Sequence, residues 1–437
     1  MSKFIYFFLL IPFTSFGQNY TSYFTGNTTD VVTTPAGGIC LMGGATEDDN
    51  AMRWFLRKVN GGDILVLRAS GSSGYNGYLY STLGIPVNSV ETIVCNNAAA
   101  SNDPYILRKI QQAEAIWFAG GDQWAYVSYW RNSPVASAIN QAIQQRHVVV
   151  GGTSAGMAIQ GKHYFSARNG SVTSAIALAN PYSNLVTVDS AAFLTNSRLH
   201  NVITDTHFDN PDRKGRLVTF LSRIFTDYGV YAKAIACDEY TAVCIDANGT
   251  ASVFGNYPAN DDNAYFIQSN CELLAKAPEN CTPGNALTWN LGGQALRVYR
   301  IKGNSTGSNT FNLNSWQAGN GGSWLNWSVA NGTFSEQNGN AITCSALSVA
   351  GTSSKPEINL YPNPTTGSVF LTTPDGTALT NRLNLYNAMG QEMAVIYSVN
   401  SRNEMMLNME GLENGVYYLI GSTKGNTVFK QKIIKSK

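Results

Sequence analysis

The chain has 437 residues, which is enough for two or three domains. Apolar residues make up 44% of the sequence and charged residues only 13%, so a large core is available and Asn, Ser, Thr and Gly must supply much of the polar surface. The formal net charge of +1 argues against a nucleic-acid-binding protein and against a polybasic membrane-surface protein, because both need an excess of Lys and Arg.

The first 17 residues are arranged like a secretory signal peptide. Lys3 gives a short positive start, residues 4–13 form a compact apolar run, and small residues lead into Gln18. The alternative is an ordinary buried strand or helix at the N-terminus. No later segment reaches the ~18 uninterrupted apolar residues that span a bilayer, so we expect no transmembrane helix in the mature protein.

Residues 38–150 alternate between short apolar runs and segments with helical periodicity. The predicted strands are 39–42, 64–67, 90–94, 116–118 and 148–150, and the predicted helices are 48–59, 101–112 and 134–145. This alternation predicts an α/β fold, a parallel sheet with helices on both faces and a functional site at the carboxyl ends of the strands. Three of the strands end where the backbone must bend sharply or approach a ligand, at Gly43-Gly44, Gly120-Gly121 and Gly151-Gly152.

The second half of this domain is less regular. A strand is predicted at 202–208, a helix at 213–225, antiparallel strands at 234–245 and 251–254 around the turn Asn248-Gly249, and a last strand at 295–301. Residues 303–354 are rich in Gly, Asn, Ser and Thr but contain three tryptophans, so we expect a loosely packed extension that becomes a linker. Short alternating strands at 357–361, 368–371, 383–386 and 416–420 then predict a small β-sandwich.

The predicted domains follow from these patterns. They are a signal peptide at 1–17, a catalytic domain at 27–302, an extension and linker at 303–355, and a C-terminal module at 356–437.

Seven cysteines are present, without a C-x-x-C pair or a metal-ligand spacing, and we expect no metal and no cofactor. Cys271 and Cys281 flank a short polar loop and are the best disulfide candidates. Two further cysteines near a predicted hairpin, Cys237 and Cys244, are a second possible pair. Cys40 and Cys95 lie in apolar runs and are predicted to be buried free thiols.

The strand at 148–150 runs into Gly152-Thr153-Ser154-Ala155-Gly156, a G-x-S-x-G elbow in the context strand, tight turn, helix. The small residues let the turn close, and Ser154 projects from the sheet edge as a candidate nucleophile. The N–H of Ala155 then faces the place where a tetrahedral oxyanion forms. The alternative is a Ser/Gly turn without chemistry.

A serine nucleophile needs a base, and the chain has four histidines. His207 ends a predicted strand, and Asp205 lies two residues earlier on the same face. We therefore favour His207 as the general base over a packing role.

The loop after the strand at 116–118 supplies a second group of candidates. Gly121 is predicted to give another oxyanion N–H, and Gln123 to bind polar atoms of the substrate. For Gln123 the alternative is a polar residue that merely begins a helix.

At these residues the chain resembles the cyanophycinase and peptidase E family of serine peptidases. The resemblance covers roughly residues 37–301 and depends on several segments in the same order. The segments are Leu41-Met42-Gly43-Gly44, Ala119-Gly120-Gly121-Asp122-Gln123, Gly151-Gly152-Thr153-Ser154-Ala155-Gly156, Asp205-Thr206-His207-Phe208 and Arg213-Lys214-Gly215-Arg216-Leu217. Such a family member is expected to have a flavodoxin-like sandwich related to class I glutamine amidotransferases.

The resemblance implies roles for individual residues. Ser154 is the implied nucleophile and His207 the implied base. Gln123, Asp205, Arg213 and Arg216 are the implied substrate-binding residues. The implied substrate is cyanophycin, an aspartate backbone that carries arginine on each side chain and is cleaved to β-aspartyl-arginine. Without the resemblance, a solvated helix start is the better interpretation of the two arginines.

The sequence departs from the family pattern in two places. The family usually has an acidic residue downstream of the serine that completes the triad, expected near Ile176, yet residues 155–188 contain no Asp or Glu. We expect that Asp189 or Asp205 orients the imidazole, that a hydroxyl such as Ser174 does so weakly, or that activity is reduced. The second departure is Pro211, where cyanophycinases have a further arginine.

The C-terminal module is similar to the type A sorting domain of the type IX secretion system. The similarity depends on Leu360-Tyr361-Pro362-Asn363-Pro364, Leu385-Tyr386-Asn387-Ala388-Met389-Gly390-Gln391, Gly415-Val416-Tyr417-Tyr418 and the Lys-rich end at 430–437. It implies the type IX machinery as a partner and a secreted or cell-surface location in a Gram-negative bacterium. The alternative is a carbohydrate-binding or adhesive β-sandwich.

The sequence thus predicts a secreted serine exopeptidase that acts on cyanophycin or a related peptide. One alternative is an aspartyl dipeptidase or another amidase on the same scaffold. The other is a catalytically weakened binding protein of the cell surface, which the missing acid motivates. The oligomeric state is left open, a homodimer included.

Overall fold

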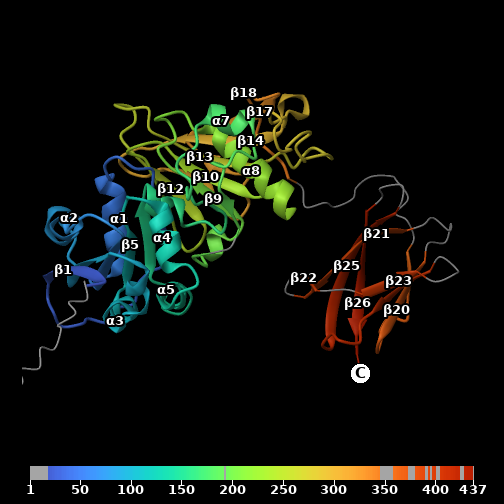
Figure 1. Cartoon of the computed structure of the whole chain (residues 1–437), viewed down its shortest axis with the longest axis horizontal. Coiled ribbons are helices and arrows are strands. Elements are labelled where there is room, and N and C mark those ends of the chain that lie inside the picture. Colours follow the sequence, from blue (N-terminus) through green and yellow to red (C-terminus); the bar gives the residue numbers. More distant parts are fainter. Residues whose placement is uncertain are drawn as a thin grey trace, which may run out of the picture. The chain divides into compact units, whose positions relative to one another are not determined.

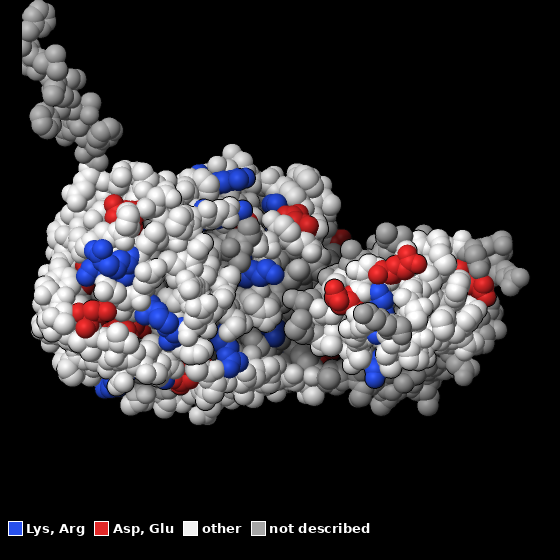
Figure 2. Space-filling model, turned by 90° about the horizontal axis from the view of Figure 1, so that it is seen from below, with Lys and Arg blue, Asp and Glu red and all other residues white. Residues whose placement is uncertain are grey.

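The computed structural model describes residues 18–190, 193–344, 358–372, 379–388, 392–393, 396–399, 404–423 and 428–436. The chain divides into two units, residues 1–345 and 346–437, which we describe separately (Figure 1). The predicted signal peptide lies outside the described residues. In the view of Figure 2, charged side chains are scattered and most of the visible described surface carries none, in keeping with the low charge content.

Five parallel strands form the middle of a ten-stranded sheet in the first unit, in the order β4–β3–β5–β6–β2. The strands are β2 (Ile39–Met42), β3 (Asp63–Arg68), β4 (Ser89–Cys95), β5 (Ala115–Phe118) and β6 (Val149–Thr153). Every residue of β2, β5 and β6 is buried, because helices cover both faces of a parallel sheet. All five predicted strands are confirmed.

Helices lie on both faces of this sheet. They are α1 (Asp49–Val59), α3 (Pro104–Gln112), α4 (Gln123–Trp130) and α5 (Pro134–Gln145), and the short α2 (Gly74–Gly77) follows β3. Alternate residues of β2 show the two faces: Leu41 belongs to the core cluster that holds α3 and α5, and Met42 to the cluster that holds α1. Aspartate or serine side chains cap the N-termini of all four longer helices.

Antiparallel strands extend the large sheet at both edges. β1 (Tyr20–Gly26) pairs with β4 at one edge. At the other edge β11 (Ala242–Ile245), β12 (Thr250–Phe254), β15 (Asn309–Asn312) and β16 (Gly319–Asn320) follow β2. The predicted hairpin at Asn248-Gly249 is confirmed, since β11 and β12 pair across it.

A second sheet of six strands completes the first unit, in the order β18–β17–β14–β13–β10–β9. Its strands are β9 (Val202–Asp205), β10 (Lys233–Cys237), β13 (Asn263–Ser269), β14 (Leu296–Lys302), β17 (Gly322–Ala330) and β18 (Thr333–Asn338). Two helices, α7 (Ser174–Ala179) and α8 (Lys214–Tyr228), share a core cluster with it. β9 and β10 are parallel, and their carboxyl ends lie at the same edge of the sheet.

Two predictions about this region were wrong. Residues 303–338 are not a loose extension: β15 and β16 join the large sheet, β17 and β18 join the second, and Trp327 is fully buried. Burial of the large apolar indole of Trp327 is favourable even though the segment around it is rich in Gly and Asn. The pairing of β17 with β14 places this side chain in the core. Residues 234–245 are likewise not one strand but β10 and β11, in different sheets, separated by a turn at residues 238–241.

The disulfide also differs from the prediction. Cys271 pairs with Cys344, with Cα atoms 5.5 Å apart, and not with Cys281, whose thiol is buried in the second core cluster. Cys237 and Cys244 are unpaired because the turn at 238–241 sends them into different sheets, and the prediction of free buried thiols at Cys40 and Cys95 is confirmed.

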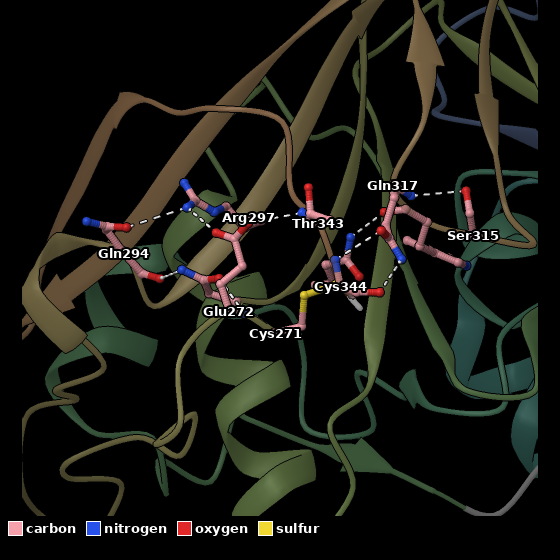
Figure 3. The surroundings of a disulfide bond; sticks show 11 residues. Cys271, Glu272, Gln294, Arg297, Ser315, Gln317, Thr343 and Cys344 are labelled. Atoms are coloured by element: carbon pink, nitrogen blue, oxygen red, sulfur yellow. Dashed lines mark hydrogen bonds and ion pairs between the residues drawn. A yellow bond between two sulfur atoms is a disulfide. The ribbon is translucent and has the colours of Figure 1, made fainter. Parts of the chain in front are cut away.

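The disulfide holds the last described segment of the first unit (Figure 3). Thr343 N–H donates to Glu272 Oε1 at 3.0 Å, and Cys344 exchanges two hydrogen bonds with the side chain of Gln317. We expect Cys344→Ser to lower the free energy of unfolding by about 2–5 kcal/mol, because the bond closes a 73-residue loop. All eight tryptophans lie in this unit, so urea unfolding followed by tryptophan fluorescence measures it. A reductant should destabilise the wild type and leave the variant unchanged; equal stability of the two proteins without reductant would contradict the prediction.

A buried histidine gives the first unit a second measurable property. His163 precedes β7 (Tyr164–Phe165), which pairs with β8 (Val188–Asp189). The residue is 1% exposed, and neither ring nitrogen makes a hydrogen bond of good geometry with the described residues, although Asn201 is near enough to raise its pKa slightly. Burial, with a smaller effect of Lys162, lowers the pKa of His163 to about 4 from 6.5.

The unfolded chain therefore binds a proton at His163 below about pH 6.5, and the folded chain only near pH 4, so stability falls as the pH drops through this window. The free energy of unfolding is lower by about 3 kcal/mol at pH 4 than at neutral pH because of this histidine. We expect His163→Phe to flatten this dependence in urea unfolding between pH 4 and 7, whereas His200→Gln, at an exposed histidine, keeps it. An unchanged slope in His163→Phe would be inconsistent with a neutral buried ring.

The second unit is a small sandwich of two four-stranded sheets, as predicted. One sheet contains β19 (Asn359–Tyr361), β20 (Ser368–Thr372), β24 (Met405–Asn408) and β23 (Ile396–Val399). The other contains β22 (Glu392–Met393), β21 (Leu379–Asn387), β25 (Gly415–Thr423) and β26 (Val428–Lys435). Residues of both sheets, including Leu371 and Leu419, form its core. Among the described helices of the whole chain, none has the length and apolar character needed to cross a membrane.

Candidate active site

Ser154 lies between β6 and the short helix α6 (Ala155–Ala158) in a strained turn. Its φ is 51° and its ψ −116°, and its N–H donates to Met42 O at 3.1 Å. A Cβ on Gly156 would lie 2.0 Å from Phe118 O, and a Cβ on Gly152 would lie 2.5 Å from the backbone of Gly156. The glycines are therefore required for the close approach of strand and helix, and the predicted strand–turn–helix context of the serine is present.

His207 follows β9 and reaches Ser154 from the second sheet. Its Nε2 lies 2.8 Å from Ser154 Oγ, a hydrogen-bonding distance. Its backbone has a φ of 47° and is held by a hydrogen bond of 2.8 Å from its N–H to Gly43 O. A Cβ on Gly44 would lie 2.4 Å from ring atoms Cε1 and Nε2, so the second glycine of the β2 turn makes room for the imidazole. The structure thus brings together Ser154 and His207, the residues predicted from the sequence as nucleophile and base.

Glu239 supplies the third member of the arrangement. Its Oε1 lies 2.6 Å from His207 Nδ1, and the side chains of His207 and Glu239 are 24% and 18% exposed. With the Nδ1–H donating to the carboxylate, Nε2 is left to accept the proton of the serine hydroxyl. The hydrogen bond from His207 lowers the pKa of Glu239, so this carboxyl stays ionised at neutral pH.

The expected orienting groups were wrong. Asp189 lies 2.5 Å from the Arg131 guanidinium, and Asp205 pairs with Arg216. Ser174 Oγ donates to Asp212 O at 2.9 Å and accepts the N–H of Arg216. Each of these three groups is paired with another residue, and the carboxylate that contacts the imidazole is that of Glu239.

The sequence signal for Glu239 is the pair Asp238-Glu239, and it becomes usable only once β9 and β10 are known to be parallel neighbours. β9 and β10 are parallel neighbours in register, with Ala236 opposite Asp205, so the residues after β10 lie beside those after β9. The Asp238-Glu239 pair follows β10 immediately. Of the two, Asp238 is buried, and burial raises its pKa to about 7 while Asn263 donates to its Oδ2 at 2.8 Å. The predicted orienting groups all precede His207 in the chain, whereas Glu239 follows it.

The loops predicted to hold the oxyanion border the serine. Ala155 is the first residue of α6, so its N–H has no acceptor within the helix. A Cβ on Gly120 would lie 3.6 Å from Ser154 Cβ, which places the Gly120-Gly121 turn next to the nucleophile. Gly121 has a φ of 147° at this turn. The role of these two N–H groups in binding an oxyanion stays a prediction.

Two of the predicted substrate-binding residues lie close to this centre. Gln123 begins α4, and its Nε2 donates to Phe165 O at 3.0 Å. Arg213 precedes α8, and its Nη1 donates to Thr206 O, next to His207, at 2.9 Å. Burial, together with Arg216, lowers the pKa of Arg213 to about 10. No ion pair neutralises Arg213 within the described part of the chain, and its Nε has no partner there.

The other two predicted substrate-binding residues, Asp205 and Arg216, are buried and pair with each other. They are 2% and 3% exposed, and the guanidinium contacts both carboxylate oxygens while it lies 5.4 Å and 5.8 Å from the ring centroids of Phe165 and Phe220. The structure places this pair as a link between β9 and α8 and not on an open surface. The prediction that Asp205 and Arg216 contact the substrate directly is therefore wrong. Their ion pair instead holds the segment between them, which contains His207 and Arg213. Among the described residues, no group of His, Cys, Asp and Glu is arranged to hold a metal ion.

Part of the first unit matches a known peptidase family. The model of Peptidase family S51 matches residues 75–187. The chain resembles peptidase family S51. A second model, Secretion system C-terminal sorting domain, matches residues 359–436, which indicates export.

Curated relatives include two cyanophycinases. The chain is 26% identical to that of Synechococcus elongatus over 227 residues, 50% of this chain and 66% of that protein. It is 30% identical to that of Geminocystis herdmanii (strain PCC 6308) over 149 residues, 33% of this chain and 50% of that protein. The matches thus span about two thirds of these relatives or less. A solved peptidase from an acI-B1 Actinobacterium matches with a TM-score of 0.39 and 14% identity, over 53% of this chain and 91% of that chain.

Proposed function

We propose that this chain is an exported serine exopeptidase that hydrolyses cyanophycin or related β-aspartyl peptides through Ser154, His207 and Glu239. The observation that supports it most is the unbroken series of contacts from Ser154 Oγ to His207 Nε2, at 2.8 Å, and from His207 Nδ1 to Glu239 Oε1, at 2.6 Å. A hydroxyl, a base and an orienting carboxylate in this order are what nucleophilic attack by serine requires.

The reaction proceeds in two halves. His207 Nε2 takes the hydroxyl proton as Ser154 Oγ attacks the scissile carbonyl carbon, and the Glu239 carboxylate stabilises the imidazolium that forms. The carbonyl oxygen becomes negative where the N–H groups of Ala155 and Gly121 face it. The imidazolium then gives its proton to the leaving amine, and a water molecule, activated by the same base, hydrolyses the acyl-enzyme.

The substrate class follows from the charge beside the base. Arg213 lies directly before α8 and donates to the residue that precedes His207. Its guanidinium makes no ion pair with the described residues, although the carboxylates of Asp205, Glu239 and Asp209 act on it from further away. Such a guanidinium suits a substrate carboxylate, as an aspartyl peptide provides. The cyanophycinase activity of the relatives and the family match support the same class.

An aspartyl dipeptidase or another amidase on the same scaffold is the alternative within the enzyme class. A catalytically weakened binding protein is less well supported, because Glu239 now occupies the position that an orienting acid needs. Export by the type IX system, with release or attachment at the surface of a Gram-negative cell, is supported by the sorting-domain match.

Substrate profiling tests the proposal. The purified protein is incubated with cyanophycin, β-Asp-Arg-containing peptides and α-Asp-X dipeptides, and products are separated by chromatography, with Ser154→Ala as the blank. We expect β-Asp-Arg from cyanophycin. Cleavage of α-Asp-X alone would favour the dipeptidase, and cleavage of none of the three by folded protein would contradict the proposed substrate class.

A further inference from the structure

The loops after β9 and β10 are joined side by side over several residues. Phe208 N–H donates to Cys237 O at 3.1 Å, where the two strands end. One step further along, Glu239 N–H donates to Asp209 Oδ1 at 2.9 Å. Asn210 Nδ2 then donates to Glu239 Oε2 at 3.3 Å. The turn that begins at His207 therefore binds Glu239 at three points. Asp209 accepts the backbone N–H of Glu239, His207 contacts Oε1, and Asn210 donates to Oε2.

These contacts restrict a side chain that would otherwise be mobile. Glu239 has three side-chain torsions and is partly exposed, so a fixed position against the imidazole costs conformational entropy. The Asp209 carboxylate holds the backbone N–H of Glu239 and so fixes where its side chain starts. Asn210 donates to the other carboxylate oxygen, Oε2, at the longer distance of 3.3 Å, and both Asp209 and Asn210 are exposed. Asp209 thus makes the stronger contribution of the two.

We propose that Asp209 is a positioning residue that holds the backbone of Glu239 so that its carboxylate meets His207 Nδ1. The inference depends on the proposed function, in which Glu239 orients the base. Asp209 contacts neither substrate nor the reacting atoms and acts through Glu239. Its Oδ1 serves as a hydrogen-bond acceptor, and an amide oxygen at the same place can do the same.

Two substitutions separate the acceptor from the charge. Asp209→Ala removes the acceptor, whereas Asp209→Asn keeps an oxygen in place and removes the charge. Asp212→Ala is the matched control, because Asp212 is an exposed acid in the same loop whose side chain binds Lys214 N–H and not Glu239. Circular dichroism confirms that each variant is folded.

The first readout is the rate at which a fluorophosphonate labels the protein, which requires an activated serine but no knowledge of the substrate. We expect Asp209→Ala to slow labelling by about 10-fold, the effect of one lost hydrogen bond, with Asp209→Asn and Asp212→Ala within about twofold of the wild type.

The second readout is the far-downfield NMR signal of the proton between His207 Nδ1 and Glu239. It should be present in the wild type and in Asp209→Asn, and weakened or shifted in Asp209→Ala. The inference would be overturned if Asp209→Ala were labelled at the wild-type rate and kept an unchanged proton signal. It would also be overturned if Asp209→Ala and Asp209→Asn lost labelling rate and proton signal to the same extent. A wild type that shows the proton signal but is not labelled would instead contradict the proposed function.

Discussion

The variant Glu239→Gln is expected to lose about 10⁴-fold in kcat while it remains folded. The glutamine side chain has almost the shape of glutamate, so packing at this partly exposed position changes little. Its NH₂ group, however, can donate to His207 Nδ1, and the imidazole then carries its proton on Nε2. That nitrogen no longer accepts the proton of Ser154 Oγ across the 2.8 Å contact.

Steady-state kinetics on the cleaved substrate measure this effect. Glu279→Gln is the control, because Glu279 accepts backbone N–H groups far along the chain and makes no described contact with His207. The control should keep kcat within about twofold. If Glu239→Gln kept more than about a tenth of wild-type kcat, an orienting role for this carboxylate would be untenable.

Gly44→Ala is expected to lower kcat by about 100-fold, the order of loss that a misplacement of about 1 Å produces. A methyl group at residue 44 would lie 2.4 Å from atoms Cε1 and Nε2 of His207, so the ring must move away from Ser154. The φ of 124° at this position adds backbone strain.

Gly61→Ala is the matched control for the strain. Gly61 also has a positive φ, of 79°, but nothing lies within 4 Å of the position its Cβ would take. We expect the control to lose some thermal stability and to keep its kcat, whereas Gly44→Ala loses activity at comparable stability. Equal kcat in the two variants would mean that the glycine is not needed to make room for the imidazole.

The parallel half of the fold is the part that the sequence predicts well. The strands β2, β5 and β6 are buried on both faces, and for this reason they stand out as continuous apolar runs with Gly-Gly at their ends. The turn at Ser154 was predictable because neighbouring backbone atoms leave no room for a side chain at Gly152 and Gly156, so the turn has a recognisable glycine pattern. His207 was predictable because a serine needs a base and this histidine closely follows a strand, although β9 ends at Asp205 and not at residue 208 as predicted.

The rest of the site depends on contacts between distant segments. Residues 234–245 have the pattern of one strand, yet the chain passes there from one sheet to the other, and the turn of this passage holds Glu239. A local pattern shows no such change of sheet. Arg216 was predicted to bind substrate, with a solvated helix start as the alternative. It is instead buried against Asp205, and this burial depends on a contact between α8 and β9 that no local pattern shows.

The most direct test of the triad is to locate the covalent adduct of a fluorophosphonate by mass spectrometry of the proteolysed, labelled protein. We expect one adduct on the peptide that contains Ser154, no adduct in His207→Ala, and slower adduct formation in Glu239→Gln. Folded wild-type protein that remains unlabelled, or that carries the adduct at another residue, would contradict a nucleophile at position 154.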